Sequence, residues 1–200
     1  MKQEIISMLK VSWPIMAIIL AMVVIIRVAY YKNHKKKVSI LNEVMLLLFV
    51  AYILILFQLV TYSNNGLNGV NLIPFKEILR YEFGSKEFTR QVIGNIILFI
   101  PFGFFITYYA NIKNIGSAFF TTVAASIVIE TVQYFIGRSF DIDDIILNVV
   151  GGLLGFLLFV ALDAVKKHLP SFFQKDIIYV ILSILLIAFI LLNIFGVISF

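Results

Sequence analysis

Long apolar stretches separated by short polar connections dominate the chain. A transmembrane helix needs about 20 predominantly apolar residues to cross a hydrocarbon core of roughly 30 Å. Six stretches of the sequence meet that length. We therefore predict an all-α fold, namely a polytopic membrane helix bundle with about six transmembrane helices. The predicted spans are residues 11–31, 40–62, 91–110, 117–137, 143–162 and 177–197.

The composition identifies the bilayer as the solvent of this chain. Of its 200 residues, 62% belong to the hydrophobic set and 14% are charged, whereas soluble domains have roughly 45–50% apolar and about 25% charged residues. The mean hydropathy is +1.03. The absence of cysteine excludes disulfides, thiol nucleophiles and Cys-ligated metals. No cofactor is expected.

The distribution of lysine and arginine predicts the orientation. Lys32, Lys35, Lys36 and Lys37 cluster in the KNHKKK connection after the first span, and cationic short loops face the cytoplasm. This connection is therefore predicted to be cytoplasmic, with both chain termini outside. The same rule explains the net charge of +5, so we expect no nucleic-acid partner.

The pattern divides the chain into three parts: two membrane spans at 1–62, a core at 63–162, and a cytoplasmic loop with a last span at 163–200. The long connection at 63–90 shows helical spacing after Pro74. Its apolar positions share one helical face and its charged positions the other: Phe75, Ile78, Leu79 and Phe83 against Lys76, Glu77 and Arg80. The pattern predicts a short amphipathic helix in the outer headgroup plane. A solvated loop is the alternative.

Polar and ionisable residues within the spans are the candidate functional residues, because they are costly in lipid and tend to face the bundle interior. Helical rise places those of the third, fourth and fifth spans at similar depth below the outer headgroups. These residues are Asn95, Glu130, Gln133, Asp144 and Asn148, with Arg138 and Asp141 above them. A carboxylate so close to lipid needs a partner such as Arg138, or else a proton. Farther along the fifth span, Gly151 and Gly155 form a G-x-x-x-G pattern, which allows close approach of another helix.

Structural explanations compete with a functional one. Asp141 or Asp143 could cap the fifth span, since aspartate is favoured at helix N-termini. The amides of Asn95, Gln133 and Asn148 could join helices by hydrogen bonds. The carboxylates could hold Mg²⁺ or Ca²⁺, although no ligand motif of known spacing is present.

Three stretches in this order resemble the VanZ-like family: NLIPF (71–75), GNIILFIPFGF (94–104) and ETVQYFIGRSFDIDDIILNVVGGLLG (130–155). These are bacterial multi-pass membrane proteins named for a teicoplanin-resistance factor, and the resemblance covers roughly residues 50–160. It implies a place in the bacterial cell membrane and a role at the envelope. It also puts weight on a set of positions: Asn71, Pro74, Phe75, Asn95, Pro101, Gly103, Glu130, Gln133, Arg138, Asp141, Asp144, Asn148 and Gly151.

Three classes of function fit these residues. The first is an envelope factor that binds or modifies an amphiphilic or lipid-linked molecule at the outer leaflet, and so confers low-level resistance to teicoplanin or other lipoglycopeptides. The second is an enzyme acting on a lipid-linked headgroup, with Glu130 or Asp144 as acid or base and Arg138 binding a phosphate or carboxylate. The third is a transporter or scaffold, which lacks the support of internal repeats. Asn71, Asn95, Gln133, Asp141 and Asn148 would bind the ligand. We expect structural roles for Pro74, Phe75, Pro101, Gly103, Gly151 and Gly155.

Overall fold

The computed structural model describes residues 2–34, 37–61, 69–166, 168–170 and 176–194. Three predicted features fall partly outside these residues. Lys35 and Lys36 of the basic connection, residues 62–68 of the long connection, and the end of the last predicted span at 195–197 are not described.

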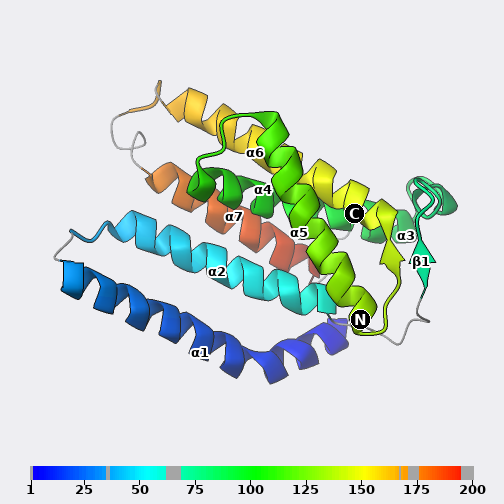
Figure 1. Ribbon diagram of the computed structural model, residues 1–200, viewed down its shortest axis with the longest axis horizontal. Helices are drawn as coiled ribbons and strands as arrows, with labels where there is room; N and C mark the ends of the chain where they lie inside the picture. The colour runs from blue at the N-terminus through cyan, green and yellow to red at the C-terminus, as the bar shows by residue number, and fades with distance from the viewer. Residues whose placement is uncertain (1, 35–36, 62–68, 167, 171–175, 195–200) are drawn as a thin grey trace. The chain divides into compact units, whose positions relative to one another are not determined.

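The all-helical prediction is confirmed. Five helices of the described chain are long and apolar enough to cross a membrane, and a shorter apolar helix follows them (Figure 1). Four of the five are single helices: α1 (Lys2–His34), α2 (Ile40–Thr61), α5 (Ile115–Phe135) and α6 (Ile142–Lys166). The remaining one is a continuous stretch of three elements: α3 (Lys86–Phe88), a π-helical turn η2 (Thr89–Ile93) and α4 (Gly94–Ala110). The shorter helix is α7 (Ile177–Ile194).

The chain forms two compact units, one comprising residues 1–55 and 166–199 and the other residues 56–165. In the first unit, Arg27 of α1 forms an ion pair with Glu43 of α2, with 2.8 Å between Nε and Oε2. Tyr31 donates its hydroxyl to the same carboxylate at 2.6 Å. These contacts explain how two apolar helices accommodate one acidic and one basic side chain.

In the second unit, α6 packs closely against α4 through glycine. A Cβ atom on Gly151 would overlap the carbonyl oxygen of Ile96, and one on Gly155 would overlap that of Ile100. On α4, a Cβ at Gly103 would collide with the backbone of α6 in the same way. This is the close helix approach that the sequence predicts for the Gly151 and Gly155 face.

Helix α5 covers another side of α6. A Cβ on Gly152 would meet the Thr122 side chain of α5. One turn away, Asn148 donates from Nδ2 to Ser126 Oγ at 2.9 Å. Both pairs are nearly inaccessible, so α4, α5 and α6 share one core.

The segment before α3 differs from the predicted amphipathic helix. Two short strands, β1 (Val70–Asn71) and β2 (Phe140–Asp141), pair in parallel, and a turn then leads to a 3-10 helix, η1 (Ile78–Arg80). Phe75 has a φ of 65°, which lies outside the right-handed helical region. The helical periodicity is therefore realised only as isolated turns, although Leu79 and Phe83 remain 80% and 87% exposed.

Candidate functional site

Four helix ends meet at one end of the second unit: the last turn of α2, the start of α4, the end of α5 and the start of α6. Two cavities lie there, with volumes of about 410 Å³ and about 140 Å³. Gln91, Arg138 and Asp144 line both of them, so the two cavities adjoin. The smaller one is lined by Leu56, Leu59, Val60, Gln91, Asn95, Leu98, Phe99, Glu130, Gln133, Arg138, Asp144 and Asn148.

Glu130 is buried on the penultimate turn of α5, with 1% of its surface exposed. Its Oε2 atom accepts the backbone N–H of Asp141 at 3.0 Å. Burial of a carboxyl group needs such compensation, because an unpaired charge is costly away from water. The bond also ties the end of α5 to the start of α6.

Gln133 and Arg138 share one acceptor at the end of α2. Gln133 Nε2 donates to the carbonyl oxygen of Val60 at 3.2 Å, and Arg138 donates to the same oxygen at 2.8 Å. This arrangement directs the Gln133 amide nitrogen toward α2. Its Oε1 atom is buried and has no hydrogen-bond partner among the described residues, a deficit that costs about 1–3 kcal/mol.

Asp144 connects α6 to α4 within the same cavity. Its Oδ1 atom accepts a hydrogen bond from Asn95 Nδ2 at 2.6 Å. Because both residues line the smaller cavity, this pair forms part of its wall. The depth argument from helical rise placed Asn95 and Asp144 in different helices at similar depth, and the structure brings them into contact.

Asp143 has a different role from its neighbour Asp144. It is 1% exposed, and its carboxylate accepts three backbone N–H groups of the segment before α3: Phe75 at 2.5 Å, Glu77 at 2.7 Å and Ile78 at 3.1 Å. Hydrogen bonds to a charged acceptor are among the stronger ones in proteins. They hold Phe75 in its left-handed conformation and attach the whole segment to α6.

Asp141 caps α6, as one of the structural explanations proposed. Its Oδ1 atom accepts the backbone N–H of Asp143 at 2.9 Å, the usual interaction of an N-cap side chain. The same oxygen accepts from Asn71 Nδ2 at 2.9 Å. Asn71 and Asp141 are also register partners of the two strands, so the cap and the strand pair form one structure.

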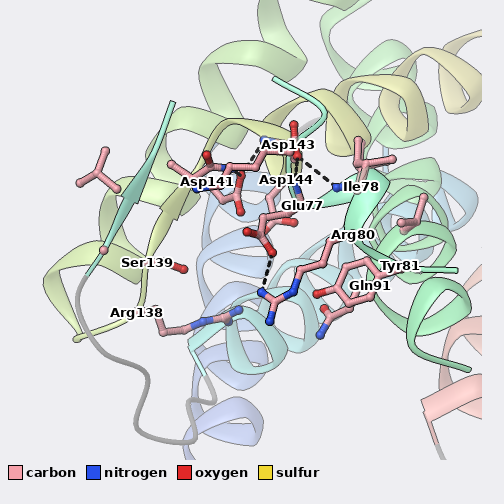
Figure 2. Close-up of a pocket in the computed structure, with 16 residues that line it drawn as sticks. Glu77, Ile78, Arg80, Tyr81, Gln91, Arg138, Ser139, Asp141, Asp143 and Asp144 are labelled. Carbon is pink, nitrogen blue, oxygen red and sulfur yellow. Dashed lines mark hydrogen bonds and ion pairs between the residues drawn. The ribbon is translucent and has the colours of Figure 1, made fainter. Parts of the chain in front are cut away.

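The larger cavity carries charges of both signs. Figure 2 shows Arg80 and Arg138 extending into it from two sides in this view, while Asp141, Asp143 and Asp144 form another part of the wall. Glu77 and Arg80 form an ion pair of 3.1 Å.

Tyr81 contributes a phenol to the wall of the larger cavity. Burial, and then the charge of Glu77, raise the pKa of this side chain. The phenol therefore stays protonated near neutral pH and can donate a hydrogen bond.

Comparison with known proteins shows which group this arrangement belongs to. The chain matches the VanZ/LLP1 family over residues 43–163, a stretch that includes every cavity-lining residue named above. The chain belongs to the VanZ-like family. It is 31% identical to Protein VanZ of Enterococcus faecium over 163 residues, covering 76% of this chain and 92% of that protein. No solved structure matches the chain.

The structure distributes the predicted site residues of this VanZ-like chain among three places. The smaller cavity receives Asn95, Glu130, Gln133, Arg138, Asp144 and Asn148. Asn71 and Asp141 line the larger one, beside the turn that contains Pro74 and Phe75. Gly103, Gly151 and Gly155 belong to the contact between α4 and α6, and Pro101 is buried inside an unbroken α4.

Several residues of the VanZ-like site were missed or underrated by sequence reasoning. Asp143 was considered only as a cap, and Ser126 was not considered. The charged residues of the predicted amphipathic helix line the larger cavity, with Lys76 and Arg80 also exposed to solvent: Lys76, Glu77 and Arg80. Their alternation with exposed apolar side chains was a usable signal, since it marks a segment with two different faces.

Within the described residues, no group of three or more His, Asp or Glu side chains is arranged to hold a metal ion. The chemistry that the VanZ-like cavities offer is hydrogen bonding and charge pairing from carboxyl, amide and guanidinium groups.

Proposed function

We propose that this VanZ-like protein is an envelope factor that binds an amphiphilic or lipid-linked molecule at the outer leaflet and thereby lowers susceptibility to lipoglycopeptides such as teicoplanin. One observation carries the proposal: a polar cavity system with charges of both signs lies among apolar, membrane-length helices. Polar groups that only joined helices would leave no such space.

The segment before α3 supports an amphiphile as the ligand. Lys76 and Arg80 line the cavity, whereas Phe75, Leu79 and Phe83 are exposed on the segment. In a membrane protein, exposed apolar side chains beside a polar cavity suit a ligand with a polar headgroup and an apolar chain. The headgroup would enter the cavity while the chain stays in the lipid.

The proposal requires the cavity end to face outward, as the basic connection predicts. The cysteine-free sequence allows a direct test with Asn33→Cys and Asn65→Cys, of which position 65 lies outside the described residues. An impermeant thiol reagent on intact cells should label Asn65→Cys only. Labelling of Asn33→Cys alone would contradict the orientation.

A susceptibility assay tests the function. Expression of the chain in a susceptible Gram-positive host should raise the inhibitory concentration of teicoplanin more than that of a glycopeptide without an acyl chain. Arg138→Gln removes the cation shared by both cavities and should abolish the difference. Lys113→Gln, at an exposed position between α4 and α5, is the matched control. Equal protection by the wild type and Arg138→Gln would refute a role for the cavity.

A second candidate function is an enzyme acting on a lipid-linked headgroup. It is favoured by the presence of two carboxyl groups, Glu130 and Asp144, in one cavity with Arg138. One carboxyl could activate a water molecule while Arg138 binds a phosphate or carboxylate. Incubation of purified protein with lipid-linked envelope precursors, followed by mass spectrometry, should then show a product that Asp144→Asn does not form.

A further inference from the structure

The smaller cavity has oxygen atoms that can accept further hydrogen bonds. Gln133 Oε1 is buried without a partner in the described chain. Among those same residues, Glu130 receives its donor on Oε2 and Asp144 on Oδ1, so each keeps a second oxygen available. Two amides on the wall each donate one N–H within the protein, Asn95 to Asp144 and Asn148 to Ser126. A molecule that brings N–H donors can bind to these oxygen atoms.

The charge of the lining has the same implication. Glu130 and Asp144 face one cation, Arg138, among the described residues that line the smaller cavity. The lining therefore has more acidic groups than cations. The adjoining larger cavity adds the cations Lys76 and Arg80 to Arg138, beside several carboxylates, so an anionic group can also be bound next to Arg138. A ligand with a positive tip for the carboxyl groups and an anionic group for Arg138 matches this lining.

The size of the smaller cavity limits the tip. A volume of about 140 Å³ holds between four and five water molecules at roughly 30 Å³ each. An aminoethyl group fits this space. A quaternary ammonium fits the chemistry poorly, because it has no N–H donor and is usually bound by several aromatic faces. Phe99 is the one aromatic residue in the described lining.

We propose that the smaller cavity binds the primary ammonium group of an amphiphile, with Gln133 Oε1, Glu130 and Asp144 as acceptors and Arg138 bound to the anionic group that follows. The proposal rests on the proposed function in that it names the ligand class of the same site. Three donors of an ammonium group match the three available acceptors.

Binding of defined lipids to the purified full-length protein tests this assignment. The protein in detergent is titrated with phosphatidylethanolamine or with phosphatidylcholine of identical acyl chains, and bound lipid is counted by native mass spectrometry. We expect about tenfold tighter binding of phosphatidylethanolamine, since only its headgroup has N–H donors. Equal binding of the two lipids would overturn the proposal.

Variants connect the preference to the cavity. Glu130→Gln and Asp144→Asn each remove a charge with little change in shape, and both should reduce the preference to less than about threefold. Glu87→Gln, at an exposed position on α3, should retain it. Two variants are used so that a folding failure of one leaves the other informative. A full preference in a folded Glu130→Gln or Asp144→Asn protein would refute the assignment.

A soluble headgroup distinguishes the source of the ammonium group. Phosphoethanolamine should compete only weakly with the lipid if the acyl chains contribute to binding. If phosphoethanolamine competes as strongly as the lipid does, the ligand is not an amphiphile, and the cavity is a site for a small soluble amine. These binding measurements need no resistance phenotype. If the purified protein prefers phosphatidylethanolamine but the susceptibility assay is negative, the proposed function is refuted and the assignment of the ammonium site is not.

Discussion

The two halves of α6 contact the same neighbouring helix in opposite ways. In the first half, Asp144 reaches α4 through a hydrogen bond to Asn95, and the space around this pair forms the cavities. In the second half, Gly151 and Gly155 bring the backbones together so closely that no Cβ fits. Without a hydrophobic effect between helices in lipid, such close packing is a main source of association. The glycine half therefore fixes the helices while the polar half keeps space between them.

This difference predicts which property each half controls. Substitutions in the glycine half act on shape and should lower the free energy of unfolding. Substitutions at the polar groups should lower stability where the side chain binds backbone amides. They should lower ligand binding or activity where the side chain faces a cavity. The expected effects on stability decrease in the order in which the following variants are presented.

Gly155→Ala should have the largest effect. Its Cβ would overlap the carbonyl of Ile100, so α4 and α6 must separate, and we expect a loss of about 3 kcal/mol. Gly94→Ala is the matched control, because its Cβ would meet only a carbonyl at 3.8 Å. Thermal unfolding in detergent measures both. Equal melting temperatures for the two variants would show that the glycine face tolerates bulk and would remove the contrast between the halves.

Asp143→Ala should follow, with a loss of about 2 kcal/mol, because three amides lose a charged acceptor. The effect should be local, so hydrogen exchange should accelerate at Phe75, Glu77 and Ile78 more than in α4. Glu87→Ala, at an exposed position of α3, should change neither the stability nor the hydrogen exchange of this segment. Unchanged exchange in Asp143→Ala would mean that the segment is held by other contacts.

Asp143 also shows where sequence reasoning reaches its limit. Span lengths and the glycine spacing depend on residues close in sequence, so both could be predicted. The partners of Asp143 lie 65 to 68 residues away, and no local pattern distinguishes its role from that of Asp144. The two-residue strands are likewise too short to show any alternation.

The segment before α3 illustrates how tertiary contacts override a local pattern. Its apolar spacing predicts a helix, yet Phe75 adopts a positive φ and the amides of the turn bind to the distant carboxylate of Asp143. The grouping of Asn95 with Asp144 could be predicted because equal depth in neighbouring helices follows from a constant helical rise. The cavity itself could not be predicted from the sequence, since its volume depends on the packing of every side chain around it.

Ser126→Ala should have a small effect on stability. It removes the acceptor of the Asn148 amide, and side-chain hydrogen bonds between membrane helices average about 0.6 kcal/mol. Thermal unfolding should therefore show a slight decrease, and the binding of phosphatidylethanolamine should persist because Ser126 is not among the residues that line either cavity. A loss of binding with unchanged stability would give Asn148 a direct role in the site.

Glu130→Gln should have the smallest effect on stability and the largest on activity. The glutamine Oε1 can still accept the Asp141 N–H that Glu130 accepts now, and an amide is easier to bury than a carboxylate. We expect a melting temperature at or slightly above that of the wild type and a complete loss of the teicoplanin effect. Asp163→Asn, at an exposed position on α6, should retain both. If Glu130 only joins α5 to α6, the glutamine variant will keep full activity, because an amide joins them equally well.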